Sequence, residues 1–275
     1  MGRRGVVSMQ DERHRGMVGR PVGKPAVVTD FAAEVVARLV AGESTLRGTG
    51  PGGLHAPLLA RLLEVARGAH AAPVEALRPE MRRARVSVAT LADHYIPAAA
   101  RCLGQDWTDD KASFAEVSIG TARLQAILRD IGSGWSADED GARDGPTVLL
   151  LVPEHEQHTL GAMVVMGRLR RAGVSVCLRT GADFASLRDL FAQRGFDAAL
   201  ISLPCAERVA LGTKLVKTLK ELTRNALPVA AGGAVLLQDE DALTCLGADI
   251  VTNDLETALR SLGLASSVTG AAHRA

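Results

Sequence analysis

The sequence predicts an α+β protein in two parts: a helical bundle that serves as a cap, and a flavodoxin-like, doubly wound α/β domain with a five-stranded parallel sheet. Residues 28–132 carry apolar side chains at helical spacing, whereas residues 147–265 alternate short apolar runs with amphipathic segments. Between them, residues 133–146 are polar, acidic and glycine-containing, which is typical of a linker. These three observations set the expected boundaries of the cap and the α/β domain.

The expected cap contains five helices, and the first three are indicated by apolar stripes and by a proline. One stripe runs from Phe31 to Val40 and a second from Leu58 to Val65. Pro73 suits the first turn of a third helix, which we expect to reach Arg83.

The last two helices of the cap are indicated by their capping residues. Ser87 is a good N-cap for the fourth helix, Pro97 is expected to kink it or to divide it into two pieces, and Gly104 is expected to end it. Ser113, with Glu116 at the third helical position, predicts a capping box at the start of the fifth helix.

Five short apolar runs after the linker predict the strands of the sheet. They are Thr147–Val152, Val174–Leu178, Ala198–Ser202, Pro228–Ala231 and Asp249–Thr252. Strands that alternate with amphipathic helices form parallel sheets covered on both faces, and right-handed crossovers favour the doubly wound order. Ligands of such sheets bind outside the carboxyl ends of the strands, near the point where the strand order reverses. We therefore expect the functional site in the loops that follow the strands.

Composition excludes several classes of protein. The chain has 32 Lys and Arg against 31 Asp and Glu, so its overall charge does not favour nucleic acid as a partner. Aromatic residues make up 3%, which is too few for a base-stacking platform. The chain shows no secretory leader and no run of about 20 apolar residues that could span a bilayer. We expect a cytoplasmic protein without membrane contact.

The two ends of the chain differ from the rest. Residues 1–27 are basic and lack a sustained apolar period, which predicts a disordered arm. Such an arm is either a solvated tail or an auxiliary contact to DNA phosphates. Residues 266–275 are small and polar, and we expect a disordered tail.

The loop after the first predicted strand carries Glu156-x-His158-x-x-Gly161. In this spacing the carboxylate can orient the imidazole for metal binding, and the glycine lets a bulky ligand approach the backbone. His155 is a competing candidate ligand that lacks the supporting pattern. The alternative interpretation of the whole loop is a polar turn with two exposed histidines.

Two further motifs fall at the ends of later strands, in the order expected of one known family. Ser202 ends the third predicted strand, and Gly232-Gly233 follow the fourth. Together with the His158 loop they resemble the signature of cobalamin-binding domains, Asp-x-His-x-x-Gly, Ser-x-Leu and Gly-Gly. The chain departs from that signature at two positions, because Glu156 replaces the aspartate and Pro204 stands where the leucine would fall.

The resemblance implies a role for each matched residue. His158 would be the lower axial ligand of cobalt, and Glu156 would fix its tautomer. Ser202 would hydrogen-bond the nucleotide tail of cobalamin, and Gly232 and Gly233 would make room for that tail. Gly161 would begin the next helix close to the corrin.

The cap also resembles a known element. The stretch LADHYIPAAARCLGQDWTDDKASFAEVSIG is similar to the helical caps that precede cobalamin domains. Trp107, in the turn expected between the last two helices, would cover the upper face of the corrin or serve only in packing. In CarH-type photosensors a Glu-His pair follows the equivalent tryptophan, whereas Val117-Ser118 stand here. His94 could replace the missing histidine from the preceding helix.

The whole chain is similar to the AerR/PpaA antirepressors, through its basic leader, its WTDDKASFAEVSIG segment and its EHEQHTLG loop. This resemblance implies a cobalamin-binding, light-responsive transcriptional regulator, not an enzyme, that modulates a CrtJ/PpsR-type repressor of photosynthesis genes by protein contact. No helix-turn-helix precedes the cap, so we do not expect the chain to read an operator by itself. Two alternatives remain open: a corrinoid methyl-carrier subunit, and a haem-binding sensor in which His158 or His155 ligates iron.

Overall fold

The computed structural model describes residues 53–70, 73–135, 145–154, 158–237 and 245–264. The predicted arm, the first predicted helix, Glu156, His155 and the terminal tail lie outside these ranges, as does most of the predicted linker.

The second half of the chain forms one parallel sheet of five strands in the order β2-β1-β3-β4-β5, which confirms the predicted fold class. The strands are β1 (Thr147–Val152), β2 (Ser175–Thr180), β3 (Ala198–Ser202), β4 (Val229–Gly232) and β5 (Ile250–Val251). The bounds predicted for β1 and β3 are confirmed, whereas β2 extends further than expected. Its last residues, Arg179 and Thr180, are polar and exposed because β2 lies at the edge of the sheet.

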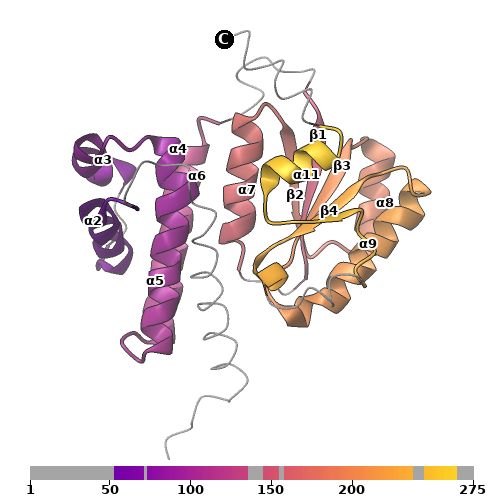
Figure 1. Cartoon of the computed structure of the whole chain (residues 1–275). Coiled ribbons are helices and arrows are strands. Elements are labelled where there is room, and N and C mark those ends of the chain that lie inside the picture. Colours follow the sequence, from indigo (N-terminus) through magenta and orange to yellow (C-terminus); the bar gives the residue numbers. More distant parts are fainter. Residues whose placement is uncertain (1–52, 71–72, 136–144, 155–157, 238–244, 265–275) are drawn as a thin grey trace, which may run out of the picture.

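Helices cover both faces of the sheet (Figure 1). Alternate residues of β1 point to opposite sides: Val148 and Leu150 pack with α7 (Leu160–Arg171) and α11 (Leu255–Ser261). Leu149 and Leu151 pack on the other side, with α8 (Phe184–Gln193) and α9 (Val209–Thr223). Residues of β1 from Val148 onward are at most 2% exposed, as expected for a central strand buried on both faces.

The described part of the cap begins with α2 (Ala56–Arg67), whose predicted stripe residues Leu58, Leu62 and Val65 are buried. The third predicted helix is divided into a 3-10 turn, η2 (Val74–Leu77), and α3 (Arg78–Ala84).

The fourth predicted helix has three parts: α4 (Val88–Thr90), the π-helical turn η3 (Leu91–Tyr95) and α5 (Ile96–Thr108). Ser87 caps it as predicted, because its hydroxyl accepts the Thr90 N–H at 3.0 Å. Pro97 lies in the first turn of α5, where a missing N–H is tolerated.

Gly104 does not end this helix, so that prediction is wrong. The helix continues for another turn to Thr108, whose hydroxyl donates to the Gly104 carbonyl at 3.0 Å. The reversal comes at Asp110, which adopts a φ of 56°. Trp107 therefore lies in the last turn of α5 and not in the connecting turn.

The fifth predicted helix is α6 (Phe114–Gly132), and its capping box is confirmed. The Ser113 N–H donates to the Glu116 carboxylate at 2.7 Å, and the Glu116 N–H donates to the Ser113 hydroxyl at 3.2 Å. Gly120 allows α6 to cross α5 closely, because a Cβ there would lie 2.8 Å from Cδ1 of Leu103.

The cap docks on α7, whose opposite sides serve two cores. Ala162 and Leu169 face the sheet, whereas Met163 belongs to the core of the cap. Near the start of α7, the Gln125 amide of α6 donates to the Thr159 hydroxyl at 3.2 Å. Among the helices that the structure describes, none has the length and apolar character needed to cross a bilayer.

Candidate functional site at the carboxyl edge of the sheet

Residues of all three predicted motifs lie at one edge of the sheet. His158 follows β1, Ser202 ends β3 and Gly232 ends β4, and these three strands are neighbours. Ser202 and Gly232 are register partners. The strand order reverses at β1, so the loops after β1 and β3 flank the point where doubly wound sheets bind ligands.

His158 and Gly161 are both accessible at this edge. His158 is exposed and stands two residues before α7. Gly161 is exposed in the first turn of α7, and a Cβ added there would meet nothing within 4 Å. The space beside Gly161 is therefore open to a ligand. The contact predicted between Glu156 and His158 lies outside the described residues.

Ser202 offers a polar group to the same edge. Ser202 is half-buried, and its chain neighbours Ile201 and Leu203 are 1% and 0% exposed. In the described part of the chain its hydroxyl makes no hydrogen bond. A half-buried hydroxyl without a protein partner is suited to bind a polar ligand group.

The packing of the loops requires glycine at positions 232 and 233, a requirement that sequence analysis missed. Gly233 adopts a φ of 130°, and a Cβ there would lie 2.1 Å from the carbonyl oxygen of Leu203. A Cβ on Gly232 would lie 2.7 Å from the carbonyl oxygen of Thr252. The two glycines thus allow the loops after β3, β4 and β5 to pack backbone against backbone.

Hydrogen bonds hold the same three loops together. The Leu203 N–H donates to the Gly232 carbonyl at 2.7 Å, and the Gly233 N–H donates to Oδ1 of Asn253 at 2.6 Å. At both glycines, the position that a Cβ would occupy faces protein backbone. The slot for a nucleotide tail, which sequence analysis assigns to them, stays a prediction.

Trp107 lies at the far end of α5, where its ring contacts Phe114 of α6. The ring centroids are 6.2 Å apart at an interplanar angle of 64°, an edge-to-face arrangement. Trp107 is half-buried, whereas Phe114 is 67% exposed. A single exposed apolar residue is common on protein surfaces and does not by itself indicate a ligand or a partner.

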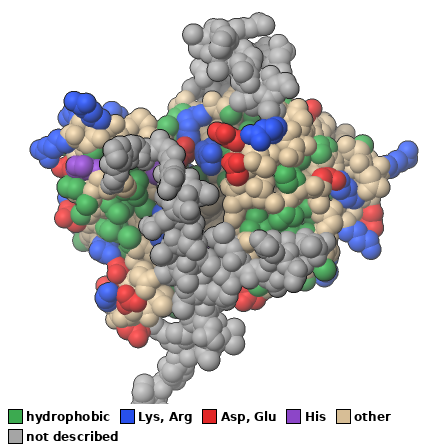
Figure 2. Space-filling model, in the orientation of Figure 1, with side chains coloured by type: hydrophobic (Ala, Val, Ile, Leu, Met, Phe, Trp, Pro, Cys, Tyr) green, Lys and Arg blue, Asp and Glu red, His purple; other side chains and the backbone are tan. Residues whose placement is uncertain are grey.

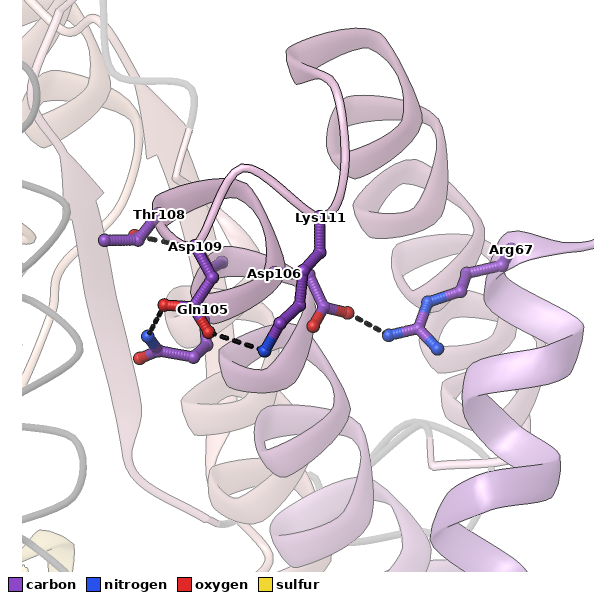
Figure 3. A network of polar contacts seen from close by, with 7 residues as sticks. Arg67, Gln105, Asp106, Thr108, Asp109 and Lys111 are labelled. Carbon is purple, nitrogen blue, oxygen red and sulfur yellow. Dashed lines mark hydrogen bonds and ion pairs between the residues drawn. The ribbon is translucent and has the colours of Figure 1, made fainter.

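A network of charged and polar side chains holds the end of α5 (Figure 3). Asp106 forms an ion pair with Arg67 of α2. Asp109 accepts from the Lys111 ammonium at 2.8 Å and from the Gln105 amide at 2.6 Å. These two hydrogen bonds lower the pKa of the Asp109 carboxyl, and the same contact with Asp109 raises the pKa of Lys111. The Arg67–Asp106 ion pair ties the last turn of α5 to α2, and the contacts of Asp109 stabilise the turn that follows α5.

One face of α6 continues beyond the carboxyl edge. Gln125 contacts Thr159, just before α7, whereas Trp135 after α6 contacts Gly167 further along α7, so the two helices run in the same direction. The first turns of α6 therefore project past the start of α7 (Figure 1). Thr121, Ser118 and Phe114 precede Gln125 by 4, 7 and 11 residues, which places them on its face of the helix. We call this face of α6 the wall, because it lies beside the carboxyl edge of the sheet.

His94 cannot reach this site, so the suggestion that it replaces a missing cap histidine is wrong. The neighbouring Asp93 pairs with Arg171 at the last turn of α7, whereas His158 precedes the first turn. The 12 residues of α7 separate these ends by about 18 Å.

A small pocket lies near that opposite end of α7, between it and α6. Its volume is about 130 Å³, and it is lined mainly by Leu128, Met163, Met166 and Trp135, with Arg129 and Arg170 also contributing. It is distinct from the carboxyl edge. Within the described ranges, no group of three His, Cys, Asp or Glu side chains is arranged to hold a metal ion.

The fold of the described residues is similar to that of a solved structure. The monomethylamine corrinoid protein of Methanosarcina barkeri matches with a TM-score of 0.57 at 13% identity, over 76% of this chain and 94% of that one.

The chain belongs to the family of the uncharacterized 20.5 kDa protein in the bchF–crtJ intergenic region of Rhodobacter capsulatus. The two are 45% identical over 191 residues, which cover 70% of this chain and all of that protein. No family model matches the chain.

Proposed function

We propose that the chain binds cobalamin at the carboxyl edge of the sheet. The observation that carries this proposal is the convergence of His158, Ser202 and Gly232 on adjacent strand ends at the reversal of strand order. The surroundings fit a bulky ligand, because Gly161 faces open space and the Ser202 hydroxyl has no partner in the described part of the chain. The corrinoid neighbour supports the same cofactor class.

Each residue has a proposed task at this site. His158 would bind cobalt, and Glu156 would accept from the other ring nitrogen and hold the imidazole in position. Ser202 would bind the nucleotide tail, and Trp107 would face the corrin from the cap. A bound alkylcobalamin would supply a cobalt–carbon bond that light can break.

We further propose that the chain is a light-responsive antirepressor that acts on a CrtJ/PpsR-type repressor by protein contact. The position of the Rhodobacter relative beside crtJ supports this role. Such a regulator works only if two states of the cofactor differ in affinity for two conformations of the protein. We propose no catalytic activity.

Binding of cobalamin is tested by spectroscopy after removal of free cofactor. Purified protein is incubated with hydroxo-, methyl- or adenosylcobalamin in the dark, desalted and measured before and after illumination. We expect the wild type and His155→Ala to retain a cobalamin spectrum and His158→Ala to lose it. Retention of an unchanged spectrum by His158→Ala would refute the ligand assignment. Glu156→Ala is expected to weaken retention by about 10- to 100-fold.

The regulatory proposal needs a separate measurement. Protein loaded with each cobalamin is mixed with a CrtJ/PpsR-type repressor in the dark and after illumination, and binding is followed by interferometry. We expect the affinity to depend on illumination for an alkylated cofactor and not for the hydroxo form. Equal affinity in every state would exclude control by light.

The structural match to a corrinoid protein of methylamine metabolism favours a second candidate, a methyl-carrier subunit. A methyl carrier would exchange its methyl group with a partner methyltransferase in the dark, whereas the regulator would not. Incubation with hemin tests the haem alternative. Haem lacks a nucleotide tail, so if the chain binds haem, Ser202→Ala should leave that haem binding unchanged.

A further inference from the structure

The pocket between α6 and α7 lies in the interface of the cap with the α/β domain. Its volume is about 130 Å³. Helix α6 contributes Leu128 and its last residue, Gly132, whereas α7 contributes Met163, Met166 and Gly167. These three residues of α7 share one face of the helix, because residues three and four positions apart are neighbours on its surface. None of the five takes part in the proposed cobalamin site.

The inner part of the pocket is apolar. Leu128 and Met163 are 3% and 8% exposed and belong to the core of the cap, so they close the pocket at its base. Met166 and the ring of Trp135 are half-buried and form its sides. Methionine side chains adapt to the shape of a ligand, and their sulfurs contact aromatic rings favourably. This lining suits an apolar group, and a ring in particular.

Two glycines and an arginine hold Trp135 in the lining. A Cβ on Gly167 would lie 3.0 Å from Cζ3 of the indole, and one on Gly132 would lie 3.8 Å from its Cε3. The guanidinium carbon of Arg171 lies 4.1 Å from the ring centroid, a favourable cation–π contact. Arg171 is itself held by both carboxylate oxygens of Asp93, at 2.5 and 2.6 Å. The indole is thus positioned by the protein without a ligand.

Two arginines give the pocket a positive rim. Arg129 of α6 is exposed and Arg170 of α7 is half-buried, and both line the pocket. Neither guanidinium makes an ion pair or a hydrogen bond with a residue that the structure describes. Nη1 of Arg171 is buried, has no hydrogen bond within the described ranges and lies 3.5 Å from the Cβ position of Gly167. Among the described residues that line the pocket, none is Asp or Glu.

This charge favours an anionic ligand. Gly132 ends α6, and the C-terminus of a helix carries about half a negative charge, which opposes an anion. The two full positive charges of Arg129 and Arg170 exceed it. Guanidinium groups bind carboxylates through paired, charge-assisted hydrogen bonds. A carboxylate at the rim would therefore supply the partner that both arginines lack among the described residues.

The size of the pocket limits the apolar part of the ligand. A cavity of about 150 Å³ with apolar sides holds a benzene ring. At about 130 Å³, this pocket has room for one ring or a short alkyl chain, with the charged group outside it at the rim. A nucleotide or a corrin is too large.

We propose that this pocket binds a small monocarboxylic acid. Its apolar body would lie against Met163, Met166 and Trp135, and its carboxylate would pair with Arg129 and Arg170. Because Arg129 belongs to the cap and Arg170 to α7, the ligand would join the cap to the α/β domain and stabilise the folded chain. The site is independent of the proposed cobalamin function.

Benzoate is the probe, and methionine methyl groups report its binding by NMR. The chain has six methionines, of which Met163 and Met166 line the pocket, whereas Met81 is buried in the core of the cap and does not line it. The whole chain, cofactor-free and isotope-labelled at these methyl groups, is titrated with benzoate. We expect saturable shifts of the Met163 and Met166 signals, with a dissociation constant on the order of 1 mM, and no shift of Met81. Met163→Leu and Met166→Leu assign the two signals.

Arginine variants test the role of charge. Arg129→Gln and Arg170→Gln should each raise the dissociation constant about tenfold, because a charge-assisted hydrogen bond is lost. Arg168→Gln is the matched control, because Arg168 lies on the same helix but its charge acts on Asp254, before α11. This variant should bind benzoate like the wild type. An equal loss of affinity in Arg168→Gln and Arg170→Gln would overturn the assignment of the carboxylate to the rim.

A variant that fills the pocket tests its location. Gly132→Leu places a side chain in the pocket at a position whose φ is not positive, and leucine is the better helix former. We expect the benzoate-dependent shifts to disappear and the melting temperature to stay the same or rise. Wild-type affinity in this variant would overturn the site.

Two further compounds separate the parts of the ligand. Benzyl alcohol keeps the ring without the charge, and inorganic phosphate keeps a charge without the ring. Both should bind at least about tenfold more weakly than benzoate. Equal affinity for benzyl alcohol would overturn the carboxylate, and equal affinity for phosphate would overturn the role of the apolar lining. If the wild type shows no saturable shift at about 20 mM benzoate, the site itself is refuted. Failure to bind cobalamin would leave each of these outcomes unchanged.

Discussion

Glycines near the carboxyl edge serve opposite purposes. A Cβ on Gly161 would meet nothing within 4 Å, whereas one on Gly233 would lie 2.1 Å from the Leu203 carbonyl oxygen. Gly233 also needs its φ of 130°, which side chains rarely permit. The first glycine faces open space, and the second lets the chain pack against itself.

Gly233→Ala should therefore destabilise the folded protein. We expect a loss of about 1–3 kcal/mol, from the backbone conformation alone, with a further cost for the clash. The free energy of unfolding is measured by urea titration. Gly195→Ala is the control, because a Cβ there meets nothing and the φ of Gly195 is not positive. Equal stability of the two variants would contradict this assignment.

Gly161→Leu should separate ligand binding from stability. Leucine suits a helix better than glycine, and we expect an unchanged or slightly higher stability, by up to about 1 kcal/mol. If a corrin lies beside Gly161, the new side chain should lower retention of hydroxocobalamin after desalting. Undiminished retention would show that the ligand does not approach this residue.

At the scale of elements, the start of α6 shows how capping supports the wall beside the edge. Phe114 follows the N-cap Ser113 directly, and its ring is 67% exposed and packs edge-to-face with Trp107. Hydrogen bonds from the N–H and hydroxyl of Ser113 lower the pKa of the Glu116 carboxyl below its ordinary value of 4.5. The capping box at the start of α6 thus favours the ionised form of Glu116.

Ser113→Ala should loosen this end of α6. Loss of an N-cap costs about 1 kcal/mol, which thermal unfolding can detect. Because the pKa of Glu116 is depressed in the folded state, its contribution is present above pH 4.5 and is lost as the pH falls through the folded pKa. We expect the wild type to lose this contribution on acidification, and Ser113→Ala to show a shallower acid dependence. Parallel pH profiles would argue against the linkage.

At the scale of the whole molecule, α7 connects two cores that the linker keeps apart in sequence. Its sheet side and its cap side are both buried, and the loop with His158 precedes it directly. A ligand held by that loop and by Ser202 would bind only the folded protein. Binding should then stabilise the whole chain by mass action.

Hydroxocobalamin at 100 times its dissociation constant should add about 2.7 kcal/mol of stability. For a chain of this size, that raises the melting temperature by about 5–10 °C. Circular dichroism at 222 nm in the dark measures the shift. His158→Ala should show none at the same concentration, whereas His155→Ala should behave like the wild type. A shift of equal size in His158→Ala would point to another ligand.

Sequence reasoning worked where local chemistry decides the structure. The capping pair Ser113 and Glu116 forms within one helical turn, so its pattern was sufficient to place the start of α6. The runs of β1 and β3 were predicted within their observed bounds, because central strands are buried on both faces and read as continuous apolar segments. The prediction that the helix ends at Gly104 is wrong because a glycine can either end a helix or lie inside one. The chain reverses direction at Asp110 instead.

The sequence by itself determined the class of fold, the order of its elements, and the strand ends that carry His158, Ser202 and Gly232. The tertiary structure decided which residues far apart in the chain meet. In the folded chain, His94 lies away from the site, and Gly233 packs against the backbone of Leu203. Arg171 pairs with Asp93 and lies over the ring of Trp135. The physical reason is that period and capping act over one or two turns, whereas a close approach between loops depends on the packing of whole helices and strands.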